Sequence, residues 1–146
     1  MQKLFDDYPD QREGIVRQLL FMGSMTGRLL LGAFGASVDD IIWEESTKEL
    51  SDSPDYVPAP DLPHMLAVLV KHEPQIVLTF GHIACEALWK LDECYKWPNQ
   101  MFHIPGPHPA ARRRDVMEQL QMMADRYYAY LTLTTERVHA FGQTKD

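Results

Sequence analysis

Residues 74 to 88 read PQIVLTFGHIACEAL, and this stretch decides the expected fold. The apolar run in its first half is typical of a buried strand, which we place at residues 75–80. Gly81 permits a tight turn, and residues 82–91 have the apolar spacing of a helix. Gly81 and His82 thus lie between a strand and a helix, at the end where open α/β sheets bind their ligands, and the residues alone favour a structural or loop-exposed His82. A single glycine is weak support for a dinucleotide site.

A second strand is predicted about twenty residues further on, in the stretch FHIPGPHPAARRR from Phe102 to Arg114. We place this strand at residues 100–104, followed by a proline-rich loop that carries His108. Prolines on both sides stiffen the loop and leave few amide donors. A histidine held there can donate a hydrogen bond to an oxygen that gains charge in a transition state. The alternative is a stiff loop with an exposed histidine.

Three consecutive arginines, Arg112, Arg113 and Arg114, are predicted to begin the last long helix, over residues 112–131. Cations at a helix N-terminus oppose the helix dipole, so they do not favour the fold. An anionic ligand would offset that cost, because helix N-termini attract phosphate. The alternative is a solvated run of charge.

The remaining elements follow from local signals. We expect a helix from Thr26, as N-cap, to Phe34, with Gly35 as its stop. A strand is predicted from Asp40 to Ser46, a surface loop at residues 51–63 and an amphipathic helix at 62–71. Residues 1–14 and 133–146 are expected to be loosely ordered. Because helices and strands alternate, we expect a parallel sheet with helices on both faces.

Composition limits the class of protein. The chain has 146 residues, enough for one domain, and a net charge of −7, which argues against broad non-specific binding to nucleic acid. No apolar run approaches the ~20 residues of a membrane span, and no signal peptide is visible, so we expect a cytoplasmic protein. The two cysteines cannot form a four-thiolate site, and Cys85 is predicted to be a core residue. The histidines have no metal-ligand spacing, so we predict no metal and no cofactor.

Three blocks together resemble the uracil-DNA glycosylase superfamily, most closely its iron–sulfur-type and related small members. They are FMGSMTGRLLL (21–31), PQIVLTFGHIACEAL (74–88) and HPAAR (108–112). The resemblance implies one domain over residues 1–146, with a three-layer α/β/α fold around a central, mostly parallel sheet. It implies a hydrolase of DNA repair that acts on a flipped-out base. His108 would donate a hydrogen bond to the base as the N-glycosidic bond breaks. The residues implied to contact nucleic acid are Gly81, His82, Pro109, Ala110, Arg112, Arg113 and Arg114.

The chain departs from the family pattern in its first half. The family's first motif, which positions the attacking water, is missing upstream of Phe21, where only Asp6 or Asp10 could replace it. The family's base-reading asparagine falls near Glu45, whose carboxylate presents acceptors only. The four cluster cysteines are also absent. The resemblance is therefore to a shortened or divergent member.

Two other classes of function stay open. One is a non-catalytic module on the same fold that binds nucleic acid, a nucleotide or a protein. The other is an interaction protein or homo-oligomer whose last helix forms the interface. The residues expected at that interface are Met117, Met122, Met123, Tyr127, Tyr128 and Tyr130.

Overall fold

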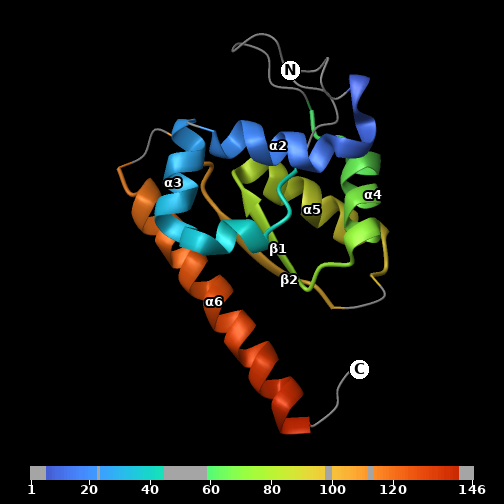
Figure 1. The fold of residues 1–146 in the computed structure, drawn as a ribbon. Coiled ribbons are helices and arrows are strands. Elements are labelled where there is room, and N and C mark those ends of the chain that lie inside the picture. The colour runs from blue at the N-terminus through green and yellow to red at the C-terminus, as the bar shows by residue number, and fades with distance from the viewer. Residues whose placement is uncertain (1–5, 23, 45–58, 98–99, 112–113, 142–146) are drawn as a thin grey trace.

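The computed structural model of the chain describes residues 6–22, 24–44, 59–97, 100–111 and 114–141 (Figure 1). Its elements in chain order are η1 (Pro9–Gln11), α2 (Arg12–Phe21), α3 (Met25–Phe34), η2 (Gly35–Asp40), α4 (Leu62–His72), β1 (Ile76–Phe80), α5 (His82–Cys94), β2 (Phe102–Gly106) and α6 (Val116–Phe141). The described chain is therefore a mixed α/β structure with helices around a small parallel sheet.

The two strands run parallel, with Ile76 opposite Phe102 and Phe80 opposite Gly106. Parallel neighbours need a crossover connection, and α5 supplies it. The predicted strand–glycine–helix unit is confirmed, although α5 continues three residues further, to Cys94. The second strand begins and ends two residues later than predicted. The expectation of a fully buried first strand was wrong, because within β1 only Thr79 is buried.

The two faces of the sheet meet different helices. Ile76, Leu78 and Phe80 of β1 pack against the main core. Side chains alternate along a strand, so Thr79 points the other way, toward α5. On that face Thr79 Oγ1 lies 2.7 Å from Nε2 of His103, whose ring meets Trp89 of α5 edge-on.

The main core joins α2, α3, η2, β2 and α6. Its buried residues are Val16, Leu30, Ala33, Phe34, Val38, Trp43, Ile104, Val116, Leu120, Met123, Ala124 and Tyr127. Helix α6 approaches β2 so closely that a Cβ added to Gly106 would lie 1.8 Å from the sulfur of Met123. Cys85 is buried on α5, as predicted.

Helix α3 begins after Ser24, not after Thr26. The Ser24 hydroxyl accepts a hydrogen bond from the Gly27 amide at 2.9 Å, which is the role of an N-cap. The Thr26 prediction was wrong because this serine, two residues earlier, already satisfies a free amide. The predicted stop at Gly35 is confirmed, since Gly35 has a φ of 60°.

The N-terminal prediction of a loose segment over residues 1–14 was wrong where the structure describes it. Helix α2 begins at Arg12, and Arg12 and Glu13 bind side chains of other elements. The predicted strand from Asp40 to Ser46 was also wrong in its described part, residues 40–44. Trp43 is instead buried beside Phe21 and Phe80. Its indole N–H donates to the Val38 carbonyl at 3.0 Å, which holds this segment in a non-strand conformation.

The helix predicted at residues 62–71 is confirmed as α4, and its N-cap is Asp61. Of the predicted loop over residues 51–63, positions 51–58 lie outside the described residues. Pro63 belongs to the first turn of α4, where proline needs no amide partner.

The last helix begins at Val116 and continues to Phe141, well beyond the predicted end at Leu131. It contains neither glycine nor proline, so nothing in its backbone stops it. The loose ordering expected over residues 133–146 stays a prediction, although the structure describes a helical backbone as far as Phe141. The C-terminal half of α6 extends away from the other elements (Figure 1).

The interface predicted on the last helix loses two of its six members, because Met123 and Tyr127 are buried in the core. Tyr128 donates to the Phe34 carbonyl at 2.5 Å, and Tyr130 stacks on Phe102. Met117 and Met122 remain exposed.

Among the described residues, no single helix is long and apolar enough to cross a membrane. Helix α2 and residues 25–40 have the length and hydropathy of a membrane span only when they are taken together, and the chain bends by 90° between them.

Candidate functional site

The two motifs singled out in the sequence meet at the carboxyl ends of the strands. The Gly81 amide, just after β1, donates to the Gly106 carbonyl at the end of β2 at 2.8 Å. A Cβ added to Gly81 would lie 3.3 Å from the Cβ of His108. Gly81 also has a φ of 94°, a conformation that L side chains rarely adopt. Only glycine at position 81 therefore allows the His108 loop to lie this close to the start of α5.

His108 is exposed, and one hydrogen bond to its ring and one to its carbonyl orient it in the loop. Its Nδ1 accepts a hydrogen bond from the Ala110 amide at 3.0 Å, and its carbonyl accepts from the Ala111 amide at 2.9 Å. In a neutral ring whose Nδ1 accepts, the proton sits on Nε2. The loop thus presents an Nε2–H donor.

The other predicted contact residues are distributed unevenly. Pro109 is buried, so it can hold the loop but not touch a ligand, whereas Ala110 and Arg114 are exposed. Arg112, Arg113 and Glu45 lie outside the described residues. Asp6 and Asp10, the two acids that could position a water, are both exposed.

The placement of the arginines at the start of a helix was wrong for Arg114. Helix α6 begins two residues later, at Val116, and the Asp115 carbonyl accepts the Gln119 amide at 2.9 Å. Glu118 already supplies a negative charge to the first turn. Arg114 therefore lies in the turn before the helix, next to its N-terminal end.

A surface pocket of about 400 Å³ begins at His82, the residue after Gly81. Its lining residues are Ala59, Pro60, Leu62, His82, Ile83, Glu86, Ala87 and Lys90. The volume falls in the range of sites for small molecules. Sequence reasoning missed Glu86 and Lys90. The available signal was the step of four residues from His82 to Glu86 and again from Glu86 to Lys90, since it places all three on one face of the helix.

We call the side chains of His82, Glu86 and Lys90 the outer face of α5. All three residues are exposed, and they make no hydrogen bond or ion pair with any described residue. Unpaired groups of both signs beside an apolar wall can bind a ligand that carries donors and acceptors.

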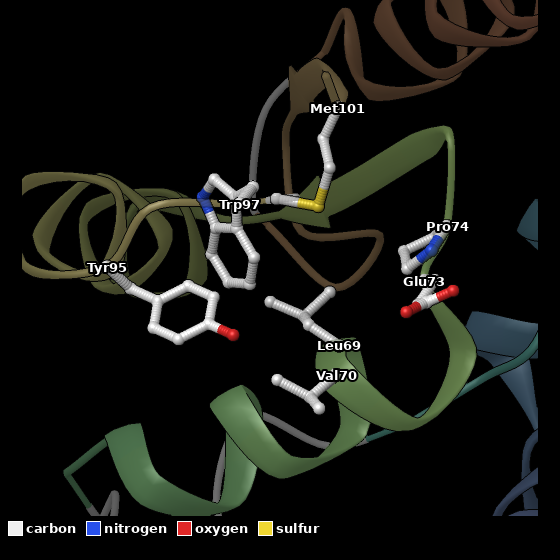
Figure 2. Close-up of a pocket in the computed structure, with 7 residues that line it drawn as sticks. All are labelled: Leu69, Val70, Glu73, Pro74, Tyr95, Trp97 and Met101. Atoms are coloured by element: carbon white, nitrogen blue, oxygen red, sulfur yellow. The ribbon is translucent and has the colours of Figure 1, made fainter. Parts of the chain in front are cut away.

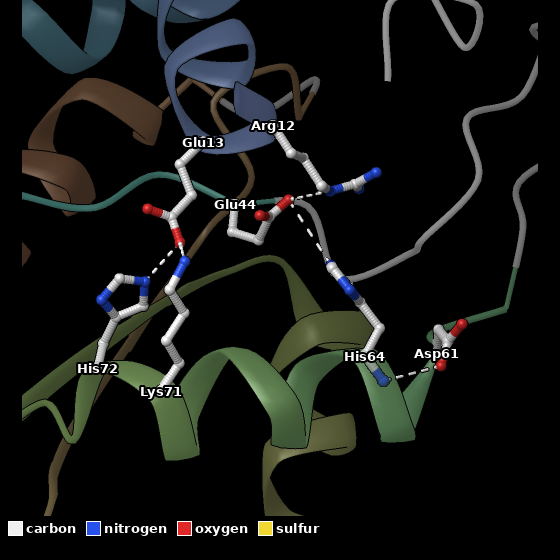
Figure 3. Close-up of polar contacts among 7 residues, drawn as sticks. All are labelled: Arg12, Glu13, Glu44, Asp61, His64, Lys71 and His72. Carbon is white, nitrogen blue, oxygen red and sulfur yellow. Dashed lines mark hydrogen bonds and ion pairs between the residues drawn. The ribbon is translucent and has the colours of Figure 1, made fainter. Parts of the chain in front are cut away.

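A second set of titratable residues lies between α2 and α4, and we call it the α2–α4 seam (Figure 3). Arg12 Nε donates to Glu44 Oε1 at 2.9 Å, and His64 Nε2 lies 3.7 Å from the same oxygen. Glu13 Oε1 lies 2.5 Å from His72 Nε2 and 3.5 Å from Lys71 Nζ. These pairs fix the position of α4 against α2, so we regard the seam as structural.

The pKa values of Glu13 and His103 differ from their ordinary values. Burial would raise the pKa of Glu13, but the hydrogen bond and charge of His72, with the charge of Lys71, outweigh it and lower that pKa. Burial lowers the pKa of His103, with Arg126 adding to it and Asp92 opposing it. Neither residue lies in the His108 loop.

No group of three or more metal-ligating side chains exists within the described ranges. Comparison of the chain with protein-family models, with curated proteins and with solved structures finds no match.

Proposed function

We propose that this chain is a divergent member of the uracil-DNA glycosylase superfamily that cleaves the N-glycosidic bond of a damaged or modified base in DNA. The observation that supports this proposal most is the contact between Gly81 and His108, which joins two of the three motifs at one edge of the sheet. The proposal includes a three-layer α/β/α arrangement, of which the two-stranded parallel sheet would be the centre.

Cleavage of the N-glycosidic bond is faster when a hydrogen-bond donor lies at the oxygen of the leaving base. When the N-glycosidic bond breaks, negative charge moves onto the leaving base, and a fixed hydrogen-bond donor stabilises that charge. The Nε2–H of His108 is such a donor, because Ala110 holds the opposite ring nitrogen. A base can reach it only after it leaves the DNA stack.

The DNA backbone would be held by the loop that follows His108. Arg114 is exposed there, and Arg112 and Arg113 precede it in the sequence. Binding to phosphates by these arginines would weaken as salt rises, because each contact releases counterions.

The test is a base-release assay on single- and double-stranded DNA that carries uracil, hypoxanthine, xanthine or 5-hydroxymethyluracil. We expect release of at least one base, with His108→Ala lowering kcat by about 100- to 1000-fold. His108→Gln should retain part of the rate, since its amide can still donate.

The matched control is His72→Ala, which removes a histidine from the α2–α4 seam and leaves the His108 loop intact. It should lower thermal stability and leave the rate constant of the folded protein unchanged. Base release that is equal in the wild type and His108→Ala would reject the catalytic role of His108.

The second candidate is a non-catalytic binding module, favoured by the unpaired outer face of α5. Its prediction is binding of a nucleotide or DNA that is lost in Lys90→Ala, without release of any base. Detectable turnover on any of the four bases would exclude this candidate.

A further inference from the structure

A small pocket lies at the opposite end of the sheet from His108, and we call it the Trp97 pocket (Figure 2). Its volume is about 60 Å³. Its lining residues are Leu69, Val70, Glu73, Pro74, Tyr95, Trp97 and Met101. They come from the end of α4, the end of α5 and the residues just before the two strands. The pocket therefore shares no residue with the candidate site at the carboxyl ends.

The aromatic walls of this pocket are fixed in place. The Trp97 indole N–H donates to Asp92 at 2.6 Å, and the Tyr95 amide donates to the Leu91 carbonyl at 2.9 Å. The two rings meet at an angle of 63° with their centroids 4.7 Å apart. They form a corner that exists before any ligand arrives.

The part of the pocket lining that comes from the end of α4 is fixed as well. Glu73 caps α4 with a φ of 46°, and its amide donates to the Leu69 carbonyl at 2.9 Å. Glu73 is the charged residue among those that line the pocket, and it is exposed.

The electrostatics of the pocket favour a cation. Helices α4 and α5 both end here, and a helix C-terminus carries partial negative charge. The last turn of α5 has no basic residue and instead contains Asp92 and Glu93, which add to the negative end of the dipole. The C-terminal end of α5 is therefore more negative than the helix dipole alone makes it.

The cations described in the last turn of α4 and beside Trp97 do not line the pocket. Lys71 and His72, in the last turn of α4, pair with Glu13 of α2. Lys96 is exposed and does not line the pocket, while Tyr95 and Trp97 on either side of it do. Alternation along an extended stretch explains this, since it turns the middle residue the other way.

We propose that the Trp97 pocket binds the methylated ammonium head group of a lysine side chain on a basic peptide. Aromatic faces attract cations, and quaternary ammonium groups are the cations that such corners recognise best. The volume is below the ~300 Å³ of typical small-molecule sites, so the pocket accepts a head group and not a whole molecule. The net charge of −7 favours a basic chain as its carrier.

The experiment is a titration of the full chain, followed by the indole N–H signal of Trp97 in NMR. The probes are short alanine peptides with one central residue: N-trimethyllysine, unmodified lysine, or the uncharged isostere that has carbon in place of the quaternary nitrogen. We expect saturable binding of the trimethyllysine peptide and about tenfold weaker binding of the isostere. Equal binding of the two would show an apolar contact only and would overturn the proposal, as would no binding at all.

Variants locate the site and check the sign of its charge. Trp97→Leu should abolish binding, which is followed in that variant by the amide signal of Tyr95 because the indole signal is absent. Glu73→Gln should weaken binding about threefold. Lys96→Ala should strengthen binding, because it removes a competing positive charge. Trp89→Leu is the matched control, since Trp89 is an exposed tryptophan earlier on α5 that does not line the pocket. Binding lost equally in Trp89→Leu and Trp97→Leu would overturn the assignment to this pocket.

Discussion

The α2–α4 seam and the outer face of α5 both contain histidine, glutamate and basic side chains, but only those of the seam pair with other described residues. In the seam, one oxygen of Glu44 serves Arg12 and lies near His64. On the outer face of α5, Glu86 has no partner among the described residues, although Lys90 is four positions away on the same helix.

The difference shows which charges the fold needs. The side chains of Arg12 and Glu44 are 14% and 11% exposed, so the loss of either removes a close opposite charge from a partly buried one. Glu86 is exposed, and water satisfies it in the absence of a ligand. Charges in the seam stabilise the fold, while charges on the outer face of α5 stay available for binding.

The largest expected effect on stability distinguishes Glu44 of the α2–α4 seam from Glu86 of the outer face of α5. Glu44→Ala should lower the free energy of unfolding by about 3 kcal/mol, because Arg12 and His64 lose their shared partner. Glu86→Ala should change it by no more than about 0.5 kcal/mol, since the side chain is on the surface. Urea denaturation of both variants measures the two values. Similar losses in the two variants would remove the distinction between seam and outer face.

The next largest effect concerns Gly81, which allows the His108 loop to lie close to α5. Gly81→Ala should cost about 1–2 kcal/mol, because alanine is strained at a φ of 94° and its Cβ would press on His108. The amide cross-peak of Ala110 should also shift in NMR, since its partner Nδ1 moves. An unchanged Ala110 amide in a destabilised Gly81→Ala variant would argue that the two motifs are not coupled.

Sequence patterns predicted the elements whose signals are local. The apolar run before Gly81 and the helical spacing after it specify β1 and α5 without reference to other parts of the chain. The meeting of His108 with Gly81 was also predictable in outline, because carboxyl ends of parallel strands lie at one edge.

Predictions failed where tertiary contacts decide the outcome. Two isoleucines and a tryptophan favour a strand at residues 40–46, but burial of Trp43 against Phe21 and Phe80 overrides that preference in the described part. The pocket beside His82 depends on where Pro60 and Leu62 pass, and no local pattern of α5 encodes that. The glycosylase activity stays a prediction.

Substitution of Gly14, inside α2, is expected to have a smaller effect on stability, and of opposite sign to that of Gly81→Ala. Gly14 is exposed, and a Cβ added to it meets nothing within 4 Å. Gly14→Ala should therefore raise the free energy of unfolding by up to about 1 kcal/mol, through helix propensity alone. Thermal unfolding of Gly14→Ala and Gly81→Ala, each compared with the wild type, checks that the two changes in stability have opposite signs. A loss of stability in Gly14→Ala would show that α2 is constrained there by a contact not accounted for.

The smallest effect is the pH dependence of the seam at Glu13. Its pKa in the folded state lies below the ordinary value of 4.5, so the unfolded chain binds more protons in that range. The stability that Glu13 contributes is complete above its unfolded pKa and is lost as pH falls through its folded pKa. Unfolding free energies from pH 6 down to pH 3 should show this loss in the wild type and less of it in Glu13→Gln. Because the carboxylate is 34% exposed, added salt should shrink the difference. Parallel profiles for the two proteins at low salt would mean that the pair with His72 forms in the folded state without stabilising it.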